Sequence, residues 1–232
     1  MNPSPLIKTK DLGKVYSTGR IQVKALDGIN LTVSKGAFLG IAGPSGSGKS
    51  TLMNLLGGLD TPTSGSIQVA GRMVSSLNHQ ELALYRRFQV GMIFQSFNII
   101  PAYTARENVA FPLLFSGVPK RERLRRAEAV LALVGLEERK DHKPSEMSGG
   151  EQQRVAVARA LIHSPDILLA DEPTGNLDSR TSQGILDLLQ EMNRIQNLTV
   201  LLISHEGYLL KKYADDIIHL YDGKVKGSEA LD

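Results

Sequence analysis

The stretch Gly43–Ser50 places glycines, a lysine and hydroxyl side chains at a spacing suited to holding phosphate groups. It follows the continuous apolar run Phe38–Ala42 and precedes a helical pattern that begins near Lys49. Glycines let backbone amides turn toward phosphates, and the following helix adds the positive end of its dipole. An unliganded glycine-rich turn is the alternative, but the strand–loop–helix context favours nucleotide. The predicted nucleotide-binding residues here are Gly43, Ser45, Gly46, Ser47, Gly48, Lys49, Ser50 and Thr51.

A second group of chemically useful side chains ends the apolar run Ile167–Ala170. Two adjacent carboxylates, Asp171 and Glu172, follow this run directly. Such a run more often simply ends at solvent, but beside a phosphate loop it can complete a site for phosphoryl transfer, which needs positioning and charge neutralisation more than covalent chemistry. We expect Lys49 to reach the β- and γ-phosphates, Ser50 and Asp171 to hold Mg²⁺, and Glu172 to polarise the attacking water. The sequence therefore predicts ATP hydrolysis, with ATP and Mg²⁺ as cofactors.

A third motif, Met147–Arg154, contains Ser-Gly-Gly-Glu at the spacing of a capping box. Ser148 is expected to cap a helix, and the amide-rich start of that helix can bind an anion. An ordinary capping box without a ligand is the alternative. The order of the motifs decides between the two, because this segment lies between the phosphate loop and the Asp171–Glu172 pair.

With that order, the segment resembles the signature motif of ABC ATPases, and the resemblance extends from Leu6 to about Lys226. It implies that the start of this helix binds the γ-phosphate held by a second copy of the chain, so that ATP is sandwiched in a homodimer. Met147 stands where the family usually has leucine, which keeps the chemical type. The nucleotide-binding residues implied by this motif are Ser148, Gly149, Gly150 and Glu151.

The resemblance also implies roles for four residues that would be unremarkable in isolation. Gln95 corresponds to the glutamine that joins the core to the helical insert and senses Mg²⁺ and water, and Asp178 to the loop that contacts the opposite subunit. His205 corresponds to the switch histidine on the γ-phosphate, although Ser-His-Glu replaces the usual Thr-His-Asp. Tyr16 corresponds to the aromatic residue that stacks on adenine. The implied catalytic residues are Glu172, His205 and Gln95, and the implied metal-binding residues are Ser50, Gln95 and Asp171.

The elements that must position these residues are predicted from hydrophobic periodicity. Strands are expected within residues 6–42, at 67–69, 167–170 and 199–203, and in a hairpin whose turn is Tyr221-Asp222-Gly223. Helices are expected from Thr104 and Ser148, over 120–136 and over 180–193. The fold class implied is α/β: a P-loop NTPase (RecA-like) core with an N-terminal antiparallel β subdomain and an inserted α-helical subdomain. The chain is divided into residues 1–95 with 164–232, which form the β subdomain and core, and 96–163, the helical signature subdomain.

The amino-acid composition limits the kinds of site, partner and cellular location that fit this chemistry. The chain of 232 residues has no cysteine, which excludes disulfides and thiolate metal sites, and its net charge of +3 gives no argument for nucleic acid. Its apolar runs are far shorter than the roughly 20 residues that span a bilayer, and Met1–Pro5 lacks the pattern of a signal peptide. The resemblance therefore implies a location on the cytoplasmic face of the cell membrane, peripheral through a separate permease.

Several segments narrow the resemblance to the lipoprotein-release and macrolide-efflux (LolD/MacB-type) branch. They are Ser96–Pro101, Thr104–Val109, the Ser-Gly-Gly-Glu variant and Ala170–Asp178. This branch couples ATP cycles to conformational work in the cell envelope. The ATPase of another importer or exporter, or of a cell-division complex, is the alternative. A non-transport ABC protein acting on DNA or ribosomes is disfavoured, because the chain has neither a long coiled-coil insertion nor a second ATPase domain.

The permease is expected to dock near Gln95–Phe115, where apolar residues stand in a region expected to be polar. They are Phe97, Ile99, Ile100 and Tyr103. A docking surface and packing inside the helical insert explain each residue equally well. The basic run Lys120–Arg126 is interpreted as a solvated helix face rather than a lipid-binding patch.

Overall fold

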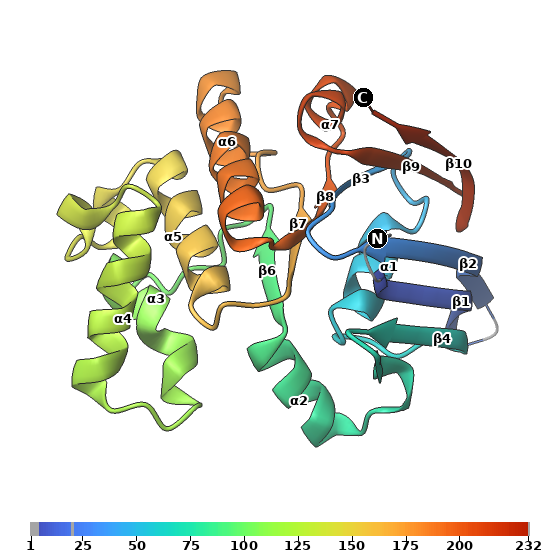
Figure 1. Cartoon of the computed structure of the whole chain (residues 1–232), viewed down its shortest axis with the longest axis horizontal. Helices are drawn as coiled ribbons and strands as arrows, with labels where there is room; N and C mark the ends of the chain where they lie inside the picture. The colour runs from blue at the N-terminus through green and yellow to red at the C-terminus, as the bar shows by residue number, and fades with distance from the viewer. Residues whose placement is uncertain (1–4, 20, 232) are drawn as a thin grey trace.

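The computed structural model describes residues 5–19 and 21–231, so most of the Met1–Pro5 segment lies outside the described residues. A six-stranded sheet forms the centre of the molecule, with a four-stranded antiparallel sheet at one end and a group of helices at the other (Figure 1). This arrangement confirms the predicted fold class. The residue boundaries of the predicted subdomains stay a prediction.

The six-stranded sheet carries the strands that end in candidate site residues. All neighbouring pairs are parallel except β9 and β10, which form the predicted hairpin with Asp222 and Gly223 at positive φ in its turn. In order across the sheet the strands are β10 (Lys224–Ala230), β9 (Asp216–Tyr221), β3 (Phe38–Ala42), β8 (Thr199–Ile203), β7 (Ile167–Asp171) and β6 (Val90–Phe94).

Two hydrophobic cores cover the two faces of this sheet. Alternate residues of one strand enter different cores: Leu168 and Ala170 pack with the helices α3–α7, whereas Ile167 and Leu169 pack with α1, α2 and the antiparallel sheet. Burial on both faces explains why the strands appear in the sequence as continuous apolar runs. The antiparallel sheet contains, in order, β2 (Ile21–Ser34), β1 (Pro5–Thr18), β4 (Ser64–Val69) and β5 (Arg72–Met73).

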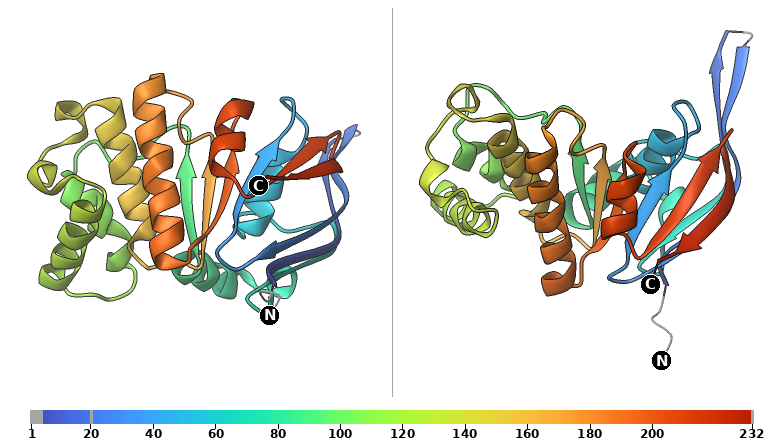
Figure 2. Two further views of the ribbon diagram at one scale, coloured as in Figure 1. Left: turned by 45° about the horizontal axis from the view of Figure 1, so that its top comes forward. Right: turned by 90° about the horizontal axis from the view of Figure 1, so that it is seen from above.

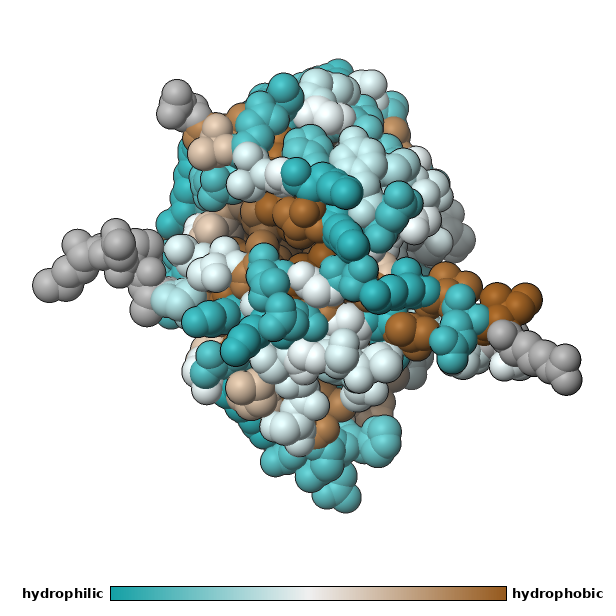
Figure 3. Space-filling view, turned by 90° about the vertical axis from the view of Figure 1, so that its right-hand side faces the viewer, coloured by the Kyte–Doolittle hydropathy of each residue, from teal (hydrophilic) through white to brown (hydrophobic). Residues whose placement is uncertain are grey.

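The hairpin of β1 and β2 projects beyond the rest of the molecule (Figure 2). Apolar atoms gather near its end in the view of Figure 3, where Ile21 is 68% and Val23 is 56% exposed. These exposed apolar side chains lie on the strand that runs back toward the phosphate loop.

The helices include two that periodicity did not predict, α2 and α7, whose short amphipathic patterns lie between strands. The helix predicted over 120–136 ends at Leu133, because Gly135 adopts a positive φ of 72° that terminates it. Both predicted capping boxes are formed, at Thr104 and at Ser148. Among the described residues no helix is long and apolar enough to cross a membrane. The α-helices are α1 (Lys49–Leu56), α2 (His79–Phe88), α3 (Ala105–Leu114), α4 (Lys120–Leu133), α5 (Gly149–Leu161), α6 (Ser179–Gln196) and α7 (Gly207–Tyr213), and the 3₁₀ helices are Val74–Ser76, Glu137–Arg139 and Pro144–Glu146.

Candidate active site

The loop between β3 and α1 has the backbone geometry that a phosphate cradle requires. Gly43, Gly46 and Gly48 have φ values of 149°, 76° and 104°, which side-chain-bearing residues rarely adopt. A Cβ on Gly48 would lie 2.5 Å from the Ala25 carbonyl oxygen, so this loop packs too closely on β2 to accept any other residue. The Ser47 hydroxyl is buried without a hydrogen-bond partner among the described residues.

Lys49 is the first residue of α1, and its side chain turns back into this loop. Its side chain is 5% exposed, and Nζ donates to the carbonyl oxygens of Gly43 (2.9 Å) and Pro44 (2.8 Å). A buried ammonium is costly unless it is paired, and here its hydrogen bonds go to neutral carbonyls, while the Asp171 carboxylate lies close enough to interact with its charge. An anion such as phosphate in the loop would add opposite charge, so the loop fits a nucleotide.

The carboxylates at the end of β7 lie beside the phosphate loop. The Ser50 hydroxyl lies beside Asp171. Burial raises the pKa of Asp171, the interaction with Ser50 opposes that rise, and the neighbouring Glu172 carboxylate adds to it. A divalent cation at Ser50 and Asp171 would favour the charged carboxylate, and would so offset the burial and the Glu172 charge that raise the pKa of Asp171. Within residues 5–19 and 21–231 no cluster of three or more His, Asp or Glu side chains could hold a metal ion.

Glu172 lies where three hollows meet: the phosphate-loop hollow, one lined by Gln95 and Asp171, and one lined by Ser204 and His205. Its Oε1 is 2.7 Å from His205 Nε2, and its backbone is left-handed at a φ of 50°. Two backbone hydrogen bonds hold that conformation: the Glu172 amide donates to the Ile203 carbonyl oxygen, and the Gly175 amide donates to the Glu172 carbonyl oxygen. The carboxylate therefore faces both the phosphate loop and the histidine from the end of β8.

Gln95 follows β6 and joins the same site from its other side. It lines two of the hollows that contain Glu172. The Asn176 side chain donates to the Gln95 carbonyl at 3.0 Å, and Gly175 lies so close that a Cβ there would be 2.8 Å from Gln95 Nε2. The loop after Glu172 and the loop after β6 are thus in direct contact.

The residues of the signature motif lie apart from this site within one chain. Ser148 begins α5, where its hydroxyl accepts from the Glu151 amide and its amide donates to Glu151 Oε2 at 2.8 Å. None of the three hollows is lined by residues 148–151. Asp178 caps α6, and Gly150 packs directly on Thr181, so the starts of α5 and α6 touch.

Tyr16 lies on β1, at the edge of the phosphate loop. Its hydroxyl donates to Asp60 Oδ2 at 2.9 Å, and its side chain contacts Thr51, although it does not line the phosphate-loop hollow. Val23 and Ala25 on β2 do line that hollow, and sequence reasoning missed them. The signal that could have found them is the exposed apolar position 23 beside a phosphate loop.

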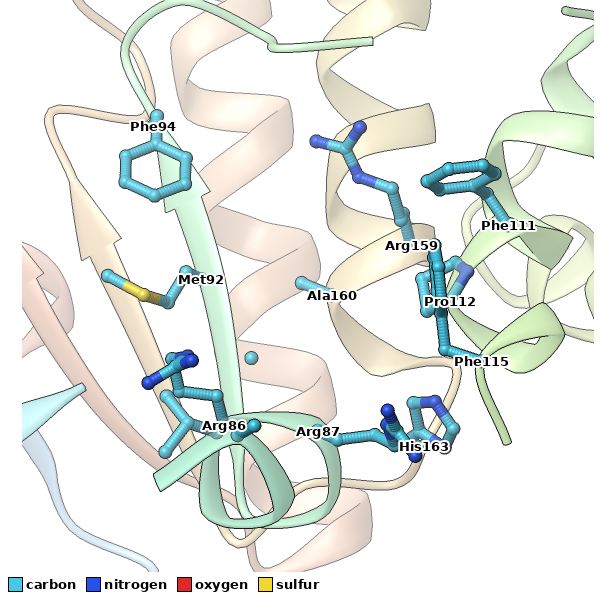
Figure 4. Close-up of a pocket in the computed structure, with 13 residues that line it drawn as sticks. Arg86, Arg87, Met92, Phe94, Phe111, Pro112, Phe115, Arg159, Ala160 and His163 are labelled. Carbon is cyan, nitrogen blue, oxygen red and sulfur yellow. The ribbon is translucent and has the colours of Figure 1, made fainter. Parts of the chain in front are cut away.

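A separate cavity of about 400 Å³ lies between the edge strand β6 and the helices α2, α3 and α5. Figure 4 shows Phe94 and Met92 on one wall and Phe111, Pro112 and Phe115 on the other, with Arg159 reaching between them. Arg159 donates to the carbonyl oxygens of Asn98 (2.6 Å) and Phe97 (3.1 Å), in the loop that follows Gln95. This cavity therefore adjoins the active site through that loop.

Some of the apolar residues expected to face a partner are packed inside the protein, and others are exposed at its surface. Ile99 packs against the buried core, whereas Tyr103 is 37% exposed and its ring lies 5.9 Å from that of Phe111. Leu114 and Phe115 at the end of α3 are 46% and 57% exposed. The exposed apolar side chains Tyr103, Leu114 and Phe115 therefore lie within the predicted stretch Gln95–Phe115.

Comparison with known proteins shows similarity over nearly the whole chain. Residues 26–175 match the family described as ABC transporter. The chain is 47% identical to a macrolide export ATP-binding/permease protein, MacB, of Brucella melitensis over 97% of its length, but spans only 34% of that protein. It is 45% identical to the lipoprotein-releasing system ATP-binding protein LolD of Xylella fastidiosa, covering 96% of this chain and 92% of LolD. A solved dimer of the ATP-binding cassette MJ0796 bound to ADP and Pi superposes with a TM-score of 0.89, at 42% identity over 97% of this chain and 99% of that one.

Proposed function

Because the chain belongs to the ABC transporter family, we propose that it is the ATP-hydrolysing subunit of a transporter and pairs with a second copy of itself. The observation that carries this proposal is the position of Glu172. It lines the phosphate-loop hollow, contacts His205 at 2.7 Å and shares a second hollow with Gln95, so one carboxylate lies among the groups of its own chain expected around the γ-phosphate.

The roles follow from this geometry. Lys49 and the loop amides hold the phosphates, Glu172 accepts a proton from the attacking water, and His205 orients Glu172 and the γ-phosphate. Gln95 positions the water from the opposite side. Mg²⁺ would be held by Ser50, Asp171 and Gln95, where it would neutralise charge on the β- and γ-phosphates.

The second copy provides what one chain lacks. The start of α5 has free amides and a capping serine suited to the γ-phosphate, yet it lies apart from the phosphate loop of its own chain. We infer that in a homodimer of this chain Ser148, Gly149 and Gly150 of one copy reach the nucleotide held by the other, with Glu151 fixing the helix start. Asp178, at the start of the adjoining helix α6, lies at the same interface.

The dimer is tested by light scattering after size exclusion, with and without Mg-ATP, together with phosphate release by the same sample. We expect hydrolysis that requires Mg-ATP, and a rise in mass from monomer to dimer when a non-hydrolysable ATP analogue is added. A sample that binds the analogue, as measured by fluorescence, and yet stays monomeric would contradict the two-chain site.

Replacement of Asp171 by asparagine tests the metal site. The neutral amide holds Mg²⁺ more weakly, so we expect the Mg²⁺ concentration for half-maximal hydrolysis to rise about tenfold or more. Because the pKa of Asp171 is raised, protons compete with Mg²⁺ for this carboxylate, and the parent should need more Mg²⁺ as pH falls. Asp187→Asn on α6 is the control. An unchanged Mg²⁺ requirement in Asp171→Asn would contradict the assignment.

The cavity in Figure 4 is proposed to receive a segment of the transmembrane permease, which would hold the chain at the cytoplasmic face of the membrane. Phe115, which is 57% exposed, carries the apolar lining of this cavity to the surface, and Arg159 connects the cavity to the loop after Gln95. We propose that this permease is of the lipoprotein-release and macrolide-efflux type, because the chain is 45–47% identical to a LolD and a MacB protein.

Phe115→Ser tests the docking surface. We expect at least a tenfold loss of affinity for the permease, since one buried aromatic anchor typically contributes about 2 kcal/mol. Hydrolysis by the isolated chain should stay at the parental rate. Leu133→Ser is the matched control, because Leu133 is 53% exposed but lies on α4, outside the cavity lining. Co-purification in detergent measures both, and equal retention of the two variants would contradict this docking site.

A further inference from the structure

The side chain of Gln153 on α5 has no role in the proposed reaction. It is fully buried, and its Nε2 donates to the Pro173 carbonyl oxygen at 2.6 Å. Its Oε1 is buried without a partner among the described residues. The amide is therefore held by a single contact, which it makes to the residue directly after Glu172.

This contact joins two functional segments of the same chain. Gln153 lies little more than one turn from Ser148, at the helix start proposed to bind the nucleotide of the other copy. Pro173 follows Glu172, whose strained backbone, at a φ of 50°, places the carboxylate over the nucleotide of its own copy. One hydrogen bond thus links a group that serves one ATP with a group that serves the other.

The same helix holds the opposite side of the active site. Arg159, further along α5, donates to the carbonyl oxygens of Asn98 and Phe97 in the loop after Gln95. Movement of α5 therefore reaches both loops that flank the γ-phosphate, one through Gln153 and one through Arg159. Of these two connections, the one through Gln153 ends next to the proposed catalytic base.

The stability of the fold does not by itself explain why residue 153 carries an amide. A buried Oε1 without a donor is unfavourable, and an apolar side chain of the same length would fill the same space without that atom. The neighbouring helix positions Val155, Ala156 and Val157 are also buried. The feature that only an amide provides here is the donor to Pro173.

We propose that Gln153 is a positioning residue that couples the two ATP sites of the dimer. ATP bound by the start of α5 fixes this helix, and the bond from Gln153 to Pro173 then holds Glu172 of that chain in its catalytic position. Nucleotide at one site thereby prepares hydrolysis at the other. This inference rests on the proposed two-chain ATPase.

The test compares Gln153→Met and Gln153→Leu, which occupy the space of the side chain without a hydrogen-bond donor, with Val157→Ala. Val157 is fully buried one turn further along α5, so its truncation reports general loosening of the helix. Each purified protein is measured for melting temperature, ATP affinity, kcat, and the Hill coefficient of hydrolysis against ATP concentration.

We expect both Gln153 variants to bind ATP with the parental affinity, while kcat falls about tenfold and the Hill coefficient falls toward 1, as loss of a typical coupling between sites produces. Gln153→Met should melt close to the parent, because the removal of the unpaired Oε1 offsets the lost bond. Val157→Ala should melt lower and keep the parental Hill coefficient.

Other outcomes separate this inference from the proposal beneath it. A parent protein without ATPase activity contradicts the proposed function itself. A parent that hydrolyses ATP without cooperativity, Gln153 variants with the parental Hill coefficient, or a Val157→Ala variant with the same kinetic defect would each overturn the coupling role.

Discussion

Replacement of Glu172 by glutamine is expected to abolish turnover while leaving ATP bound. The amide has the size of the carboxylate and keeps the contact with His205, but it cannot accept a proton from water. General bases contribute about 10²–10⁴-fold to such reactions, so we expect kcat to fall by about 10³-fold. Affinity for ATP should stay parental, because Lys49 and the loop amides that hold the phosphates are unchanged.

The same substitution should also trap the dimer. If hydrolysis reopens the pair, a chain that binds ATP without hydrolysing it accumulates in the closed state, and light scattering should give the mass of a dimer with Mg-ATP and of a monomer without nucleotide. Glu191→Gln, at an exposed position of α6, is the matched control and should behave as the parent. Hydrolysis by Glu172→Gln at the parental rate would show that the proton acceptor is another group.

Sequence reasoning predicted those parts of the fold and site that depend on local patterns. The phosphate loop was predictable because glycines at fixed spacing are needed for backbone with positive φ, and Gly43, Gly46 and Gly48 adopt it. The capping boxes at Thr104 and Ser148 were predictable for the same reason, since both partners of each box lie three residues apart.

The parts that the sequence did not predict depend on contacts between distant segments. The burial of Gln153 against Pro173 and the reach of Arg159 to Asn98 join residues 20 and 61 positions apart. Helix α7 was missed because it is short and has no capping side chain, whereas α2 carries a capping box at Asn78 and Glu81 that could have predicted it. The left-handed backbone of Glu172 has no local signal either, because it is held by the Ile203 and Gly175 hydrogen bonds.

Replacement of Lys49 by alanine is expected to prevent ATP binding, whereas Glu172→Gln is expected to prevent hydrolysis of ATP that is already bound. A buried charge that loses its partner typically costs about 3–5 kcal/mol, which corresponds to a loss of affinity of about 10²–10³-fold. Lys49 is 5% exposed, so its attraction to phosphate is weakly screened by water and salt. Fluorescent ATP titration should therefore show little binding at concentrations that saturate Glu172→Gln, and no ATP-dependent dimer should form.

The matched control is Lys24→Ala, which removes the same charge from the lining of the same hollow. Lys24 is exposed and paired with Asp27 at 2.6 Å, and exposed ion pairs contribute about 0–1 kcal/mol, so we expect a change of a few-fold at most. Without nucleotide, Lys49→Ala should melt near the parental temperature, because the cost of burying the ammonium offsets its hydrogen bonds to Gly43 and Pro44 and its attraction to Asp171. Equal losses in the two variants would mean that the hollow attracts ATP by its overall charge. A loss confined to Lys49→Ala would mean that the phosphates lie within the loop, where this buried ammonium alone can reach them.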